Sequence, residues 1–104
     1  MYRNGIILLL GRKLSSRKSL PIVTMFSKAE GCSLCDDAKE VMMKFKKKFI
    51  YEEVDITANG NQKWFNKYKY DIPVIHINNQ EVMRHKVFEK PFLEALKQAE
   101  SRIS

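Results

Sequence analysis

Residues 22–35 read IVTMFSKAEGCSLC. The first five residues are mainly β-branched or aromatic and are followed by a polar loop, which predicts a buried strand over Ile22–Phe26. From Leu34 onward, apolar residues recur at helical spacing while charged residues occupy the other faces, as an amphipathic helix requires. Cys32 and Cys35 therefore stand where a buried strand passes into a helix. The apolar positions of this predicted helix are Leu34, Ala38, Val41, Met42 and Phe45.

The next segments predict a second strand, a short helix and a third strand. Tyr51–Ile56 has the composition of a strand, and the sequence Asn59-Gly60-Asn61 that follows is typical of a turn. The third strand is predicted within residues 71–77. Pro73 lies near its beginning, where strands tolerate proline. The short helix between these strands is marked by Trp64, Phe65 and Tyr68, whose helical spacing indicates packing in the core.

The last third of the chain predicts a hairpin and a closing helix. Asn78-Asn79 tolerates positive φ and leads into a fourth strand, Gln80–Arg84. The last helix is expected from Glu89 to Ser101, with Pro91 in its first turn, where proline is accepted. The side chains expected to point inward from this helix are Phe92, Leu93, Leu96 and Ala99.

The order of the predicted elements is βαβαββα, which places the chain in the α/β class. The first βαβ unit requires a parallel pair of strands joined by a right-handed crossover, and the hairpin adds an antiparallel pair. The prediction is a four-stranded mixed sheet flanked by helices. One domain over residues 22–104 accounts for all of it, preceded by a leader over residues 1–21.

The net charge of +7 over 104 residues is concentrated in that leader. Residues 1–21 hold five basic side chains and no acidic one, whereas residues 22–104 hold 14 basic and 12 acidic side chains. The domain itself is nearly neutral, so its charge gives no argument for an anionic partner. The lysine run at residues 44–48 is read as a solvated helix face. We therefore expect neither nucleic acid nor membrane among the partners.

The composition of the leader bears on location. Its apolar run, Ile6–Leu10, is far shorter than the ~20 residues of a membrane span and shorter than the ~7–15-residue core of a secretory signal. An arginine-rich, serine-containing segment without acidic residues is typical of a mitochondrial transit peptide. A solvated cytosolic tail has the same composition. The expected location is mitochondrial or cytoplasmic.

The spacing Cys32-Ser33-Leu34-Cys35 at a helix start predicts a redox-active pair. Unpaired N–H groups and the positive end of the helix dipole stabilise a thiolate there. Cys32, outside the helix, is the expected nucleophile, and Cys35, one turn further in, is the expected resolving thiol. The negative charges of Asp36 and Asp37 repel the thiolate and oppose this stabilisation. The positive charge of Lys28 offsets part of that repulsion.

Other interpretations of the two cysteines stay open at this point. A structural disulfide of this spacing closes a very short loop and gives little stabilisation. A zinc site needs four ligands, and the remaining candidates, His76 and His85, lack the spacing of a finger. His76 is expected to be buried in its strand or satisfied by a polar partner, and His85 to lie in an exposed loop.

Two segments together resemble a known family. Val23–Cys35, with Ser-Lys after the strand and then the cysteine pair, resembles the opening of glutaredoxins, and Asp71-Ile72-Pro73-Val74 resembles the segment that supplies the cis-proline of thioredoxin-fold oxidoreductases. The chain is most similar to a poorly characterised subfamily of glutaredoxin-like proteins over about residues 22–100. The resemblance implies a thioredoxin-like fold, a cis Pro73 beside the cysteines, and pairing of the Ile72 backbone with an extended substrate. It also implies contact between Lys28 and a glutathione carboxylate.

The chain departs from the glutaredoxin pattern at two places. Ser33-Leu34 stands where an aromatic residue is usual between the cysteines. Arg84-His85-Lys86 stands where a Gly-Gly pair usually follows the fourth strand and exposes backbone N–H groups to glutathione. The fold and the redox chemistry follow from the resemblance, whereas the use of glutathione does not.

The predicted function is a glutaredoxin-like thiol–disulfide oxidoreductase with Cys32 and Cys35 as catalytic residues and Lys28, Ile72 and Pro73 as substrate-binding residues. No metal is expected, and no cofactor is required, with glutathione as a candidate reductant. The expected partner is a disulfide-containing protein or a glutathione mixed disulfide, and the chain is expected to be a monomer. The alternatives are a non-catalytic protein-interaction module of the same fold and an iron–sulfur or metal carrier.

Overall fold

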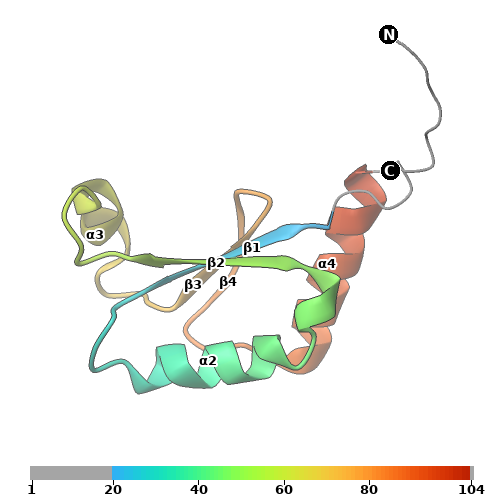
Figure 1. The fold of residues 1–104 in the computed structure, drawn as a ribbon, viewed down its shortest axis with the longest axis horizontal. Helices are drawn as coiled ribbons and strands as arrows, with labels where there is room; N and C mark the ends of the chain where they lie inside the picture. Colours follow the sequence, from blue (N-terminus) through green and yellow to red (C-terminus); the bar gives the residue numbers. More distant parts are fainter. Residues whose placement is uncertain (1–19, 104) are drawn as a thin grey trace, which may run out of the picture.

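The computed structural model describes residues 20–103. The leader therefore lies almost wholly outside the described residues. The prediction of a mitochondrial or cytoplasmic location, which rests on the leader, also falls outside them. Among the residues that the structure describes, no helix is both long enough and apolar enough to cross a bilayer. Figure 1 shows a twisted sheet with α2 against one of its faces and α3 on the other side.

The order of elements confirms the βαβαββα prediction. The first half comprises β1 (Ile22–Ser27), α2 (Ser33–Met43), the short 3₁₀ helix η1 (Lys46–Lys48) and β2 (Ile50–Asp55). The second half comprises α3 (Gln62–Tyr68), β3 (Val74–Ile77), β4 (Gln80–Arg84) and α4 (Glu89–Ile103).

The sheet is mixed, with strand order β2-β1-β3-β4. Strand β1 pairs with β2 in parallel and with β3 antiparallel, and β3 and β4 form the predicted antiparallel hairpin. The hairpin turn is made by Asn78 and Asn79, whose φ angles are 51° and 68°. Asparagine adopts this left-handed region more readily than most residues, so the local sequence explains the turn.

Each face of the sheet buries its own apolar cluster, because successive side chains of a strand point to opposite faces. On β1, Val23 and Met25 face α2 and α4, whereas Phe26 faces α3. The cluster on the face covered by α2 and α4 is called the first cluster, and the one on the α3 face the second. The first cluster includes Cys35 and Ala38 of α2. The members of this first cluster from α4 are Phe92, Leu96 and Ala99, which confirms three of the four inward positions predicted for that helix, and Leu93 is half-buried against them.

The second cluster surrounds a buried histidine. The Tyr68 hydroxyl lies 2.9 Å from His76 Nε2, and the side chains of Trp64 and Phe26 pack with their ring centroids 4.5 Å apart. His76 is only 8% exposed. The structure thus confirms that the aromatic set of the short helix packs in the core and that His76 is buried with a polar partner.

The burial of His76 predicts a loss of stability in weak acid. Burial is the main cause that lowers the pKa of His76, while Glu81 raises it and Lys67 lowers it by smaller amounts. The unfolded chain binds a proton near pH 6.5 and the folded protein only at lower pH, so protonation favours unfolding. The free energy of unfolding should be level above about pH 7 and fall below about pH 6.5, by at most about 1.4 kcal/mol per pH unit from this group.

Urea denaturation at pH 7.5 and 5.5 measures this effect, with His76→Gln as the matched variant. The glutamine amide keeps a hydrogen-bonding group near the Tyr68 hydroxyl but takes up no proton. We expect a smaller fall in unfolding free energy for His76→Gln than for the unchanged protein. The two proteins are identical at every other position, so the comparison isolates the contribution of residue 76. An equal fall in both would show that His76 does not titrate in this window.

The first helix differs from the prediction at both ends. The side chain of Leu34 is 46% exposed and does not point inward, whereas that of Cys35, the next residue in the same turn, enters the first cluster. At the other end α2 stops at Met43, and Phe45 caps η1, so its half-buried ring reaches the first cluster from outside the helix. The lysine run is exposed as predicted, but three of its members form η1 and not a face of α2.

Candidate active site

The two cysteines lie at the amino-terminal end of α2. Strand β1 ends at Ser27, and the loop that follows turns at Gly31, whose φ of +75° is a conformation that L side chains rarely adopt. Cys32 is then the N-cap of α2, with extended backbone angles. The backbone turn that places Cys32 at the start of the helix therefore favours glycine at the preceding position.

Cys32 and Cys35 form a disulfide with their Cα atoms 5.3 Å apart. The backbone N–H of Cys35 donates a hydrogen bond to Cys32 Sγ over 3.1 Å. The two cysteines differ in access, since Cys35 is only 3% exposed and belongs to the first cluster, whereas Cys32 is half-buried at its edge. The Cys32 sulfur is thus the more accessible one, and it receives a donor from the first turn of the helix.

Charges around this helix start act in both directions. The free N–H groups and the dipole of α2 favour a negative sulfur at Cys32. Asp36, in the first turn, and Asp37 are exposed and oppose it. Lys28 is exposed on the preceding loop and forms no ion pair with any of residues 20–103 within 4.0 Å.

A polar network ties α2 to the sheet behind the cysteines. Tyr51 and Ser27 hydroxyls donate to the two carboxylate oxygens of Glu53 over 2.9 and 3.0 Å, and Lys39 Nζ of α2 lies 3.2 Å from the same carboxylate. Burial by itself would raise the pKa of Glu53, but these hydrogen bonds and the lysine charge lower it overall. Glu53 therefore stays ionised and fixes the position of α2 against β2.

The Ile72–Pro73 segment lies at the same end of the strands as the loop that leads from β1 to the two cysteines. Phe26, near the end of β1, pairs with Val74, the first residue of β3, so the segment before β3 and the loop after β1 leave the sheet together. The Ile72–Pro73 peptide bond is cis, as the resemblance implied. Ile72 is half-buried and packs, like Cys32, on the first cluster. No backbone hydrogen bond joins Ile72 to another residue of 20–103.

The segment after β4 holds the proline loop in place. The backbone N–H of His85 donates to the Pro73 carbonyl over 2.7 Å. His85 Nε2 lies 3.5 Å from one carboxylate oxygen of Asp71, and an Arg84 guanidinium nitrogen lies 3.1 Å from the other. His85 also has a φ of 72°. This position therefore has the backbone conformation that favours glycine, although it carries an imidazole side chain.

A narrow crevice opens beside the cysteine pair. Its volume is about 80 Å³, and one wall is α2 while the other is the segment after β4. The residues that line it are Leu34, Asp37, Ala38, Val41, His85, Lys86 and Val87.

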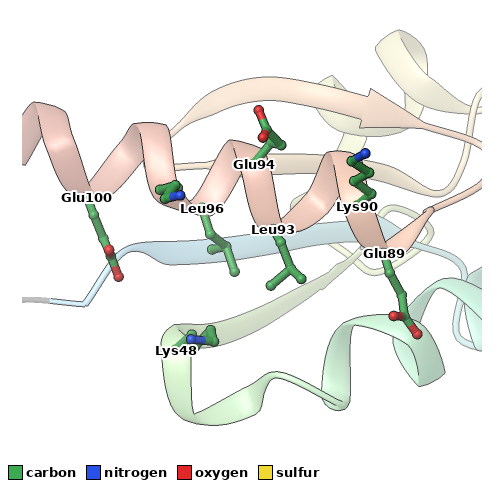
Figure 2. A pocket seen from close by; sticks show the side chains of 8 residues that line it. Lys48, Glu89, Lys90, Leu93, Glu94, Leu96 and Glu100 are labelled. Atoms are coloured by element: carbon green, nitrogen blue, oxygen red, sulfur yellow. The ribbon is translucent and has the colours of Figure 1, made fainter.

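A larger hollow of about 470 Å³ runs along α4 and has no part in the redox centre. Figure 2 shows Leu93 and Leu96 pointing into it toward Lys48, while Glu94 and Lys90 point away. Among the residues that the structure describes, no group of three or more His, Cys, Asp or Glu side chains is placed to hold a metal ion.

Comparison with known proteins agrees with this arrangement. Residues 22–97 match the family described as Glutaredoxin-like domain (DUF836). The chain belongs to this glutaredoxin-like family. A curated relative, the Glutaredoxin-like protein YDR286C homolog of Dictyostelium discoideum, is 33% identical over 87 residues, which cover 78% of this chain and 79% of that protein. The match to the family spans the cysteine pair and the cis-proline segment alike.

Two solved structures are similar in fold to this glutaredoxin-like chain. A malarial protein aligns with a TM-score of 0.52 at 19% identity, over 77% of this chain and 97% of its own. A protein of unknown function from Staphylococcus aureus aligns with a TM-score of 0.51 at 15% identity, over 78% of this chain and 92% of its own. With the sheet order and the family match, these similarities agree with a thioredoxin-like α/β fold.

The sequence predicted the cysteine pair and the proline segment but missed what holds them. Nothing in the pattern indicated that Asp71 binds both Arg84 and His85, or that the segment 85–87 forms a crevice with α2. The available signal was the position of these residues. Asp71 precedes β3 and Arg84 ends β4, so an antiparallel hairpin brings the two together.

Proposed function

We propose that this glutaredoxin-like protein is a thiol–disulfide oxidoreductase with Cys32 as nucleophile and Cys35 as resolving thiol. The observation that carries the proposal is the difference between the two sulfurs: Cys32 lies at the accessible N-cap of α2, and Cys35 is buried one turn behind it, close enough to form the disulfide. A structural disulfide would need no such difference in access. Membership in the glutaredoxin-like family supports the same chemistry.

The reaction proceeds in two exchanges. The Cys32 thiolate attacks one sulfur of a substrate disulfide, which forms a mixed disulfide and releases the other substrate sulfur as a thiolate that takes a proton. The Cys35 thiolate then attacks Cys32 Sγ, breaks the mixed disulfide and releases the second substrate thiol. The substrate gains two electrons, and the pair becomes the Cys32–Cys35 disulfide. Two thiol equivalents from a reductant return the pair to the dithiol.

The chain's own residues support these steps. The Cys35 N–H, which contacts Cys32 Sγ at 3.1 Å, is placed to stabilise negative charge on that sulfur. The unpaired backbone of Ile72, next to the cis-proline, offers an edge on which an extended substrate would pair. The proposed substrate is a disulfide-containing protein or a glutathione mixed disulfide. No metal or organic cofactor enters either exchange.

A turnover assay tests the proposed function and identifies the reductant. Because His85 and its neighbours replace the Gly-Gly pair, we expect glutathione with glutathione reductase to be a slower donor than thioredoxin reductase. The assay follows NADPH oxidation with a peptide disulfide as substrate, and protein lacking both thiols, Cys32→Ser/Cys35→Ser, is the control. Turnover no faster than this control with either donor would refute the proposed function, and faster turnover with glutathione would overturn only the donor assignment.

A further inference from the structure

The crevice beside the cysteines has apolar walls. Ala38 and Val41 of α2 form one side, and Val87, which is 4% exposed and part of the first cluster, forms the other. Leu34, one of the two residues between the cysteines, also lines the crevice, and its side chain is 46% exposed. A surface leucine inside the redox motif therefore continues directly into a preformed apolar slot.

The position of the crevice restricts what can fill it. Leu34 lines the crevice and follows Cys32 by two residues in the chain, so residues that flank the reacting cysteine of a polypeptide joined to Cys32 have the crevice within reach. Lys86 and Asp37 both line the crevice, and their opposite charges offset one another. A neutral, apolar group carried by the substrate matches these walls better than a charged one.

We propose that the crevice binds one aliphatic side chain next to the reacting cysteine of a polypeptide substrate, so that the natural substrates are protein disulfides flanked by such a residue. This inference rests on the proposed function and names its substrate class. The volume of about 80 Å³ is well below the ~150 Å³ of a cavity that holds benzene, which favours a branched aliphatic chain over an aromatic ring. Glutathione, with glutamate and glycine beside its cysteine, has no side chain to place there.

Two peptide substrates test the inference. They are mixed disulfides with the same leaving thiol and differ only in leucine or glycine beside the cysteine. We expect kcat/KM for the leucine peptide to be about 10-fold higher or more, the scale on which apolar pockets discriminate. Equal values for the two peptides would overturn the inference and leave the proposed function intact. Failure to reduce either peptide would instead refute the proposed function.

A variant of the protein supplies the second test. Val41→Phe places a larger side chain in the crevice, two turns away from the cysteines, and should lower the leucine-to-glycine ratio to about 2-fold or less. The ratio compares two substrates on the same protein, so it does not depend on how much of the variant is folded. Val82→Phe, at an exposed valine of β4 outside the crevice, is the matched control and should keep the full ratio. An unchanged ratio in Val41→Phe would contradict the proposed binding of the side chain.

Discussion

Cys32→Ser is expected to lower the rate of disulfide reduction by about 1,000-fold or more, because the first exchange has no other nucleophile. A serine hydroxyl does not ionise near neutral pH and does not attack a disulfide under these conditions. The buried Cys35, only 3% exposed, cannot take over the first step. Turnover of a peptide disulfide by purified, fully reduced protein measures the loss.

Two control variants separate loss of the nucleophile from a general effect of substitution at the helix start. Ser33→Ala changes an exposed neighbour inside the same motif and should leave the rate within about 2-fold. Cys35→Ser should still react once through Cys32 but fail to complete the cycle with a peptide disulfide. If Cys32→Ser kept more than a tenth of the activity, the assignment of Cys32 as nucleophile would be wrong.

Phe92→Ala is expected to lower the free energy of unfolding by about 3–5 kcal/mol. Phe92 lies in α4 with no exposed surface, and its ring meets that of Phe49 edge-on at 5.6 Å between centroids. It also belongs to the first cluster, together with Cys35. Truncation leaves a cavity where α4 packs on the sheet, and a small domain has only about 5–15 kcal/mol of stability in total.

Phe88→Ala is the matched control for this prediction. Phe88 lies just before α4, and its side chain is 57% exposed, so the same truncation creates no cavity and should change the unfolding free energy by less than about 0.5 kcal/mol. Urea denaturation of the three proteins gives the comparison. Similar losses in both variants would mean that burial of Phe92 is not what stabilises α4 on the sheet.

The sequence was sufficient for the order of elements because each has a strong local signal. Strand β4 was predicted at its observed bounds, Gln80–Arg84, because two asparagines that accept positive φ precede it. The buried His76 followed from its place between two isoleucines of a strand. These features depend on residues close together in the chain, and local chemistry decides them.

Features that depend on contacts between distant segments were not predictable in the same way. Leu34 fits the apolar repeat of α2, yet it is exposed, and it is the neighbouring Cys35 that packs in the first cluster. His85 has a glycine-like φ, and its backbone N–H donates to the carbonyl of Pro73, twelve residues earlier in the chain. The crevice likewise requires α2 and the segment after β4 to lie together, which periodicity does not report.

The role of Cys32 as nucleophile is tested most directly by the mass of the Cys35→Ser protein after it reacts with an excess of a peptide disulfide. We expect the mass to increase by that of one peptide thiol minus two hydrogens, with the added group located on Cys32 by digestion and removed by added dithiol. Cys32→Ser treated in the same way should keep its original mass. An unmodified Cys35→Ser protein, or modification of Cys32→Ser to the same extent, would show that Cys32 is not the nucleophile.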